Sequence, residues 1–134
     1  MTALRIRGSG SAAPVPLYER VGGQAFFDRL VEQFYDGVEA RPRLRVMYPE
    51  ELTDAKRHLA LFLGQYFGGP TTYLEERGHP MLRARHAPYV IGAAERDDWL
   101  EAMLDAVDAV NPPAAERQEL VAYLDLAAHQ LRNA

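Results

Sequence analysis

The sequence contains no cysteine among its 134 residues. Without cysteine the chain can form no disulfide framework, zinc–thiolate site or iron–sulfur cluster, and it has no cysteine nucleophile. The HExxH, P-loop, nucleophile-elbow and GxGxxG signatures are also absent, and the histidines share no spacing that would pair two of them on one helical face. Any metal must therefore be held through histidine, carboxylate or a carried cofactor.

Long apolar runs and excess basic charge are missing as well. No segment approaches the roughly 20 apolar residues that span a bilayer, and residues 1–16 lack the continuous apolar stretch of a secretory signal. Lysine and arginine number 15 against 19 acidic residues, which gives a net charge of −4. A chain of this charge is not expected to bind nucleic acid. We therefore expect a cytoplasmic protein that binds neither nucleic acid nor membranes.

The composition predicts one compact domain, because 48% of the residues are hydrophobic and 25% are charged. Residues 1–16 are rich in small residues and show no apolar periodicity, so we expect a flexible tail followed by a domain over 17–134. Every basic residue except Lys56 is arginine. This bias fits either genome composition or a specific use of arginine.

Apolar residues recur at three- and four-residue spacing along most of the domain, which predicts helices. No run alternates with period two for long enough to form a sheet, and residues 43–48 are expected to be a short connector between prolines. The long helices are expected from near Gln24, from Thr53 or Asp54 (either of which can cap it), around 99–110, and around 120–131. The sequence therefore predicts an all-α fold.

Residues 71–94 are the least regular part of the sequence, with room for a short helix only between Pro80 and His86. Within them, residues 77–94 contain three arginines and two histidines but no acidic residue. This stretch can be a surface loop that pairs with acids elsewhere, or a site for a small anionic ligand. His86 can likewise be an exposed polar residue or a ligand aimed into the core.

Three aromatic residues that carry a polar atom lie on or near the apolar stripes: Tyr35, Tyr48 and Trp99. Each can be a core residue with one satisfied polar atom. If they converge on one cavity, they offer two O–H donors and one N–H donor in apolar surroundings. Such donors suit a partly anionic diatomic ligand.

Five stretches of the sequence form a recognisable set of motifs: FYDGV (34–38), RVMYPEEL (45–52), LFLGQYFGGP (61–70), TYLEERGHPMLRARHAPYVIG (72–92) and ERDDWL (95–100). Together they resemble the truncated haemoglobins, specifically their group II or O-type branch. The resemblance covers all of the chain except the tail. It implies a globin-like two-over-two helical sandwich with a long proximal loop, and a haem b cofactor (iron protoporphyrin IX).

By this resemblance His86 is the proximal ligand of the haem iron, and Tyr35, Tyr48 and Trp99 are the polar residues on the distal, gas-binding side. Ala55 replaces the distal histidine of larger globins, and Arg83 and Arg85 suit the haem propionates. The other implied haem contacts are His58, Leu59, Phe62, Leu63, Tyr89 and Met103.

Two positions depart from the pattern of the family that the sequence resembles. His58 stands where relatives commonly place an arginine for a propionate, which predicts weaker or pH-sensitive anchoring. Phe67 stands where close relatives often carry tryptophan, and we expect this change to be structural.

The resemblance implies a protein that binds dioxygen and other diatomic gases such as nitric oxide and carbon monoxide. Three donors would release dioxygen too slowly for simple oxygen transport. This favours peroxidase-like turnover or nitric oxide dioxygenation, supported by an unidentified reductase. The alternatives are gas or redox sensing, oxygen storage without turnover, and a haem-free helical interaction domain; a homodimer is left open.

Overall fold

The computed structural model describes residues 14–134, together with the backbone of residues 6–7 and 9–10. Most of the predicted flexible tail lies outside the described residues, so the tail and its boundary with the domain stay predictions. The elements are strands β1 (Ile6–Arg7) and β2 (Ser9–Gly10) and helices α1 (Leu17–Arg20), α2 (Gln24–Glu39), α3 (Pro42–Arg45), α4 (Thr53–Tyr66), α5 (Thr72–Arg77), α6 (Leu82–His86), α7 (Ala93–Val110) and α8 (Ala114–Leu131).

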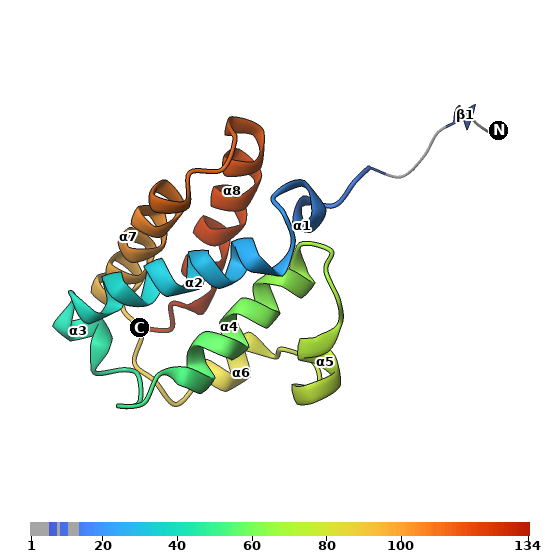
Figure 1. Cartoon of the computed structure of the whole chain (residues 1–134). Coiled ribbons are helices and arrows are strands. Elements are labelled where there is room, and N and C mark those ends of the chain that lie inside the picture. The colour runs from blue at the N-terminus through green and yellow to red at the C-terminus, as the bar shows by residue number, and fades with distance from the viewer. Residues whose placement is uncertain (1–5, 8, 11–13) are drawn as a thin grey trace.

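The long helices pack as two pairs, α2 with α4 and α7 with α8, and α2 crosses α7 to join the pairs (Figure 1). This arrangement confirms the predicted all-α two-over-two sandwich. The two short strands pair with each other in parallel and lie outside it. Across residues 14–134, the helices are too short or too polar to cross a membrane.

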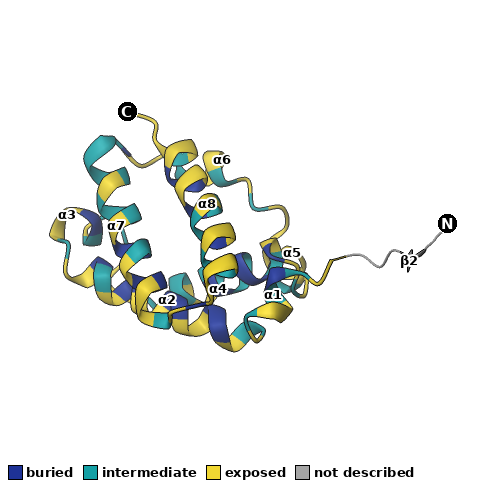
Figure 2. Ribbon diagram, turned by 90° about the horizontal axis from the view of Figure 1, so that it is seen from above, coloured by how far each residue is buried: buried dark blue, intermediate teal, exposed yellow. Residues whose placement is uncertain are grey.

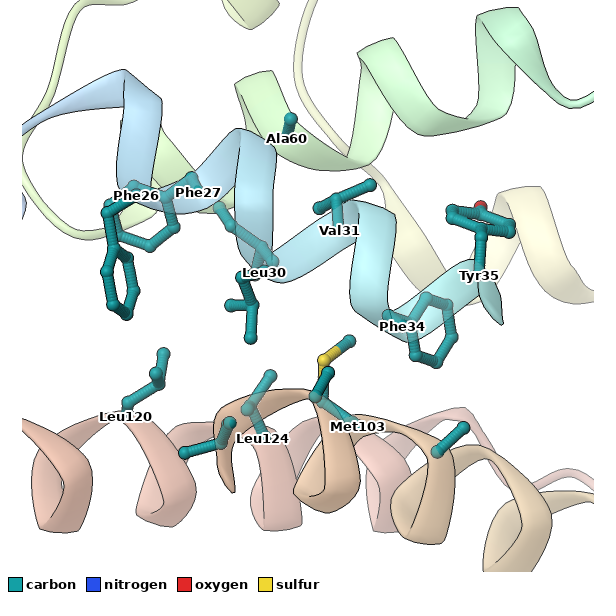
Figure 3. Close-up of a cluster of buried hydrophobic side chains, with 14 of the residues drawn as sticks. Phe26, Phe27, Leu30, Val31, Phe34, Tyr35, Ala60, Met103, Leu120 and Leu124 are labelled. Atoms are coloured by element: carbon teal, nitrogen blue, oxygen red, sulfur yellow. The ribbon is translucent and has the colours of Figure 1, made fainter. Parts of the chain in front are cut away.

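Helix α2 supplies the centre of the core. It begins at Gln24, as predicted, directly after Gly23, whose φ of 81° is left-handed and stops a helix from continuing through it. Phe27, Leu30 and Phe34 repeat at helical spacing and are completely buried. Their side chains meet Met103, Leu120 and Leu124 from α7 and α8 (Figure 3), and Figure 2 shows this buried face turned inward on each long helix.

Two local predictions were wrong. Neither Thr53 nor Asp54 caps α4, because the N-cap position is Leu52. The Glu51 carboxylate instead accepts hydrogen bonds from the Thr53 N–H (3.1 Å) and hydroxyl (2.6 Å). Residues 71–94 also hold one more helix than expected, since α5 precedes α6. A six-residue helix spans less than two turns and leaves little apolar periodicity to detect.

Gly68 is expected to be a stability-critical glycine just after α4. Its φ is +100°, and a Cβ added there would lie 2.4 Å from the Pro16 Cβ. Gly68→Ala should therefore lower the free energy of unfolding by about 1–3 kcal/mol, measured by thermal denaturation. Gly78→Ala is the matched control, because Gly78 has a φ of +75° but nothing within 4 Å of its added Cβ. If the two variants lost the same free energy of unfolding, the close approach to Pro16 would contribute nothing to the destabilisation.

Candidate functional site

A cavity of about 340 Å³ opens between α4 on one side and α6, α7 and α8 on the other. A second cavity of about 180 Å³ shares Tyr48, His86, Tyr89, Trp99 and Leu131 with it, so the two adjoin. The larger one has the size typical of a small-molecule site. Its lining is mainly aromatic and aliphatic and includes no aspartate or glutamate.

One wall of the cavity comes from a single stripe of α4. Ala55, Leu59, Phe62 and Leu63 lie at positions i, i+4, i+7 and i+8, which places them on one helical face. All four line the cavity. The small Ala55 side chain stands in the first turn of α4, at the start of this wall.

His86, the last residue of α6, borders both cavities. Its Nδ1 lies 2.7 Å from the Leu82 carbonyl oxygen. Because a carbonyl only accepts hydrogen bonds, Nδ1 must carry the proton, and in the neutral ring Nε2 keeps its lone pair. A backbone partner of this kind fixes the tautomer and the orientation of a metal-binding histidine. In this tautomer, the Nε2 atom of His86 can bind a metal ion as a neutral ligand.

Asn133, which lies just after α8, holds the connector between α6 and α7 through hydrogen bonds. The Asn133 Oδ1 accepts the Ile91 N–H at 2.8 Å, and its Nδ2 donates to the Tyr89 carbonyl at 2.9 Å. The backbone N–H of Asn133 also donates to the Ile91 carbonyl at 2.8 Å. These bonds hold the chain that directly follows His86. Sequence reasoning missed Asn133, because a polar residue after the last apolar repeat gives no signal of a distant partner.

Tyr35, Tyr48 and Trp99 converge on the cavity from α2, the segment after α3, and α7. The rings of Tyr35 and Tyr48 meet edge to face with centroids 5.4 Å apart, and Trp99 lines the same cavity. Figure 3 shows Tyr35 on the side of α2 that faces away from α7 and α8. The structure thus brings together the three donors that the sequence singled out.

The tyrosine hydroxyls of this cluster stay protonated. Burial raises the pKa of Tyr35 to about 12. The pKa of Tyr48 is raised further, chiefly by burial and also by the neighbouring Tyr35, while the Trp99 hydrogen bond opposes the change. Both residues are therefore neutral O–H donors at physiological pH and are poorly suited to bind a metal as tyrosinate.

Basic side chains occupy another part of the cavity lining: His58, Arg77 and Arg85. The Arg77 Nη1 lies 3.5 Å from the His58 Nε2, and burial together with Arg77 lowers the pKa of His58. Arg85 donates to the carbonyls of Pro80 (2.7 Å) and Arg77 (3.0 Å). Among residues 14–134, no carboxylate forms an ion pair with Arg77, Arg83 or Arg85. This observation favours an anionic ligand over pairing with acids elsewhere.

Two of the expected contacts lie elsewhere. Arg83 borders a separate surface hollow near Asn133, because two residues along a helix point to different sides and Arg85 takes the cavity side. Met103 is fully buried against α2 and lies in the core (Figure 3). Tyr89 lines the cavity. The cavity residues that sequence reasoning missed are Tyr73, Arg77, Leu82, Tyr123, Leu124, Ala127 and Leu131.

The residues that line the cavity fit a large apolar cofactor that already contains a metal ion and carries acidic substituents. Within the described part of the chain, no cluster of three or more histidine or acidic residues could hold a free metal ion. The His86 imidazole is available as an axial ligand, and the walls of the cavity are apolar. Arginines that form no ion pair with a carboxylate of residues 14–134 suit the acidic substituents.

Comparisons with known proteins point in the same direction. The sequence model described as "Bacterial-like globin" matches residues 16–133. A group 2 truncated hemoglobin of Bacillus subtilis is 42% identical over 116 residues, which cover 87% of each chain. The crystal structure of a hemoglobin from Chloroflexus aurantiacus is 50% identical, with a TM-score of 0.88 over 90% of this chain and 100% of that one. A thermostable hemoglobin from Thermobifida fusca is 53% identical, with a TM-score of 0.87 over 90% and 98% of the two chains.

Proposed function

Because the chain belongs to the bacterial-like globins, within their group II truncated haemoglobins, we propose that His86 is the axial ligand of haem b and that Tyr35, Tyr48 and Trp99 hold its diatomic ligand. Membership of this family makes the chain a haem-binding globin that binds oxygen. When bound, haem supplies an iron with an open position for diatomic gases and for redox chemistry. The protein supplies the axial nitrogen, an apolar enclosure and directed donors.

The apolar side chains of α4 and the aromatic residues of α7 and α8 that line the cavity would enclose the porphyrin. The haem propionates are carboxylates, so we place them near His58, Arg77 and Arg85, where no acidic residue lines the cavity. Arg77 replaces Arg83 in this proposal, because Arg77 borders the cavity and Arg83 borders a different hollow.

His58→Arg tests the propionate contact on α4. The pKa of His58 is lowered, so the wild-type ring is neutral at pH 7 and an arginine there adds a permanent positive charge. One added, partly exposed ion pair of roughly 0.5–1 kcal/mol would slow haem loss about two- to fivefold. Haem transfer to an excess of apomyoglobin measures this rate. His79→Arg adds the same charge at an exposed position outside the cavity lining, and an equal effect there would contradict a specific contact.

The convergence of three neutral donors in an apolar cavity is the observation that supports redox chemistry over transport. Hydrogen bonds to a partly anionic ligand slow its release, and slow release suits conversion of the ligand better than delivery. We therefore propose peroxidase-like turnover or nitric oxide dioxygenation, with electrons from a separate reductase. Steady-state consumption of peroxide or nitric oxide with a reductase present tests this. A rate no faster than that of free haem would contradict turnover and leave storage or sensing.

The rate of dioxygen release is expected to be independent of pH between 6 and about 10. Burial raises the pKa of Tyr35 to about 12 from its ordinary value of 10, and that of Tyr48 also rises. A raised pKa keeps the O–H donor present as pH increases, and the donor is lost only above the raised value. Stopped-flow release from the ferrous protein measures the profile. An acceleration with a midpoint near the ordinary tyrosine pKa would contradict the assignment.

A further inference from the structure

Tyr66 of α4 and Tyr123 of α8 form an unusually close pair of oxidisable rings. Their centroids are 3.8 Å apart and their planes differ by 25°. Among the aromatic pairs of residues 14–134, no other centroid distance is as short. Neutral rings usually prefer offset or edge-to-face contacts with centroids about 4.5–7 Å apart. The pair is therefore closer and more nearly parallel than aromatic side chains usually pack.

The pair connects the haem cavity with the molecular surface. Tyr123 lines the cavity. Tyr66 does not line the cavity, and 52% of its surface is exposed. Both residues also border a surface hollow, together with Val15 and Leu126. A chain of two stacked rings thus runs from the ligand cavity to solvent.

We propose, building on the redox function proposed above, that Tyr66 and Tyr123 relay single electrons from phenolic reductants in solution to the haem cavity. A reductant too large to enter the cavity can then react at the exposed Tyr66 ring. The haem site and the reductant site are separate in this arrangement, and the substrate class is an aromatic donor of one electron, such as a phenol.

The environments of the two rings suit different parts of this relay. Burial, together with Tyr66, raises the pKa of Tyr123 to about 12, so the hydroxyl of the inner ring is protonated before an electron is transferred. The half-exposed Tyr66 can release its proton to water when it is oxidised. A positive charge shared between two stacked rings is also stabilised by the electron-rich ring faces.

The electrons and protons of the relay balance for the reduction of one hydrogen peroxide molecule. Reduction of hydrogen peroxide to two waters takes two electrons and two protons. Each electron leaves Tyr66 through Tyr123, and the Tyr66 O–H bond breaks as its proton goes to water, which leaves a neutral tyrosyl radical. A phenol then gives a hydrogen atom to Tyr66 and becomes a phenoxyl radical. Two phenols and one peroxide thus yield two phenoxyl radicals and two waters, and Tyr66 is restored.

Spin trapping locates the radical without relying on turnover. Haem-loaded protein is treated with one equivalent of hydrogen peroxide and a nitroso spin trap, and the adduct is mapped by peptide mass spectrometry. We expect an adduct on Tyr66 that is lost in Tyr66→Phe and in Tyr123→Phe, where Tyr66 is still present. Guaiacol should suppress the adduct while it is oxidised. Tyr18→Phe, which removes a hydroxyl outside the relay and the cavity, should retain the adduct.

Three results would overturn the relay. An adduct on Tyr89, which also lines the cavity and is 47% exposed, would assign the exit to that residue. Retention of the Tyr66 adduct in Tyr123→Phe, in protein whose carbon monoxide spectrum is unchanged, would show that Tyr123 is not the link. Peroxide consumption no faster than that of free haem would reject the proposed redox function and the relay with it, whereas normal consumption with no Tyr66 adduct would reject the relay alone.

Discussion

His86→Gly is expected to abolish tight haem binding and to give the largest change of any single substitution in the cavity. Substitution of residues that only orient a metal ligand costs roughly 10–100-fold in affinity, and loss of the ligand itself should exceed this. The Leu82 carbonyl already holds Nδ1, so the variant loses an imidazole that is oriented before the cofactor arrives. The rate of haem transfer to apomyoglobin and the absorbance spectrum of the ferrous protein measure the effect.

Added imidazole distinguishes a lost ligand from a damaged fold. The glycine variant has room for free imidazole, which should restore a histidine-type spectrum if the side chain acts as the axial ligand. His58→Ala is the matched control, because His58 is the other histidine of the cavity lining. It should keep the wild-type spectrum. A spectrum that survives in His86→Gly without imidazole, but is lost in His58→Ala, would assign the ligand to α4.

Trp99→Phe and Tyr35→Phe are each expected to speed dioxygen release about tenfold to a hundredfold. Each removes one donor to a partly charged ligand, worth about 1.5–3 kcal/mol. Laser photolysis of the carbon monoxide complex in the presence of dioxygen measures the rate. Tyr73→Phe removes a hydroxyl from a cavity-lining residue outside this cluster and should leave release nearly unchanged. Unchanged release in both donor variants would contradict the proposed role of the cluster.

The donors are not expected to act additively. Trp99 and Tyr48 line the same cavity, and Tyr48 packs against Tyr35, so removal of one group changes the surroundings of the others. The double variant Trp99→Phe/Tyr35→Phe should therefore deviate from the sum of the single effects, as is usual for residues that are coupled through a shared cavity. Tyr48 can compensate in part in each single variant.

The residues that could be predicted are those whose position follows from local periodicity. The α4 wall is an example, because Ala55, Leu59, Phe62 and Leu63 share one helical face whatever packs against it. The apolar spacing likewise predicted the core of α2. The roles of His86 and the distal cluster came from the resemblance, since histidine and tyrosine spacing alone left several interpretations open.

The residues that sequence reasoning missed depend on contacts between distant segments. Tyr123 and Leu131 lie on α8, whose cavity face is defined only once α6 packs beside it. Arg77 reaches the cavity because the unpredicted α5 places it beside His58. Met103 lies one helical turn after Trp99 on α7, but α2 packs against α7 at Met103 and buries its side chain in the core. Tertiary geometry, rather than local pattern, decides each of these positions.

The Asn133 contacts also impose an order of events during biosynthesis. Translation proceeds from the N-terminus, so every residue that lines the cavity is made before Asn133 leaves the ribosome. Until then the 87–91 connector lacks the bonds from Asn133 to Tyr89 and Ile91. A nascent chain that has emerged only as far as α8 therefore carries His86 beside a connector that Asn133 does not yet hold.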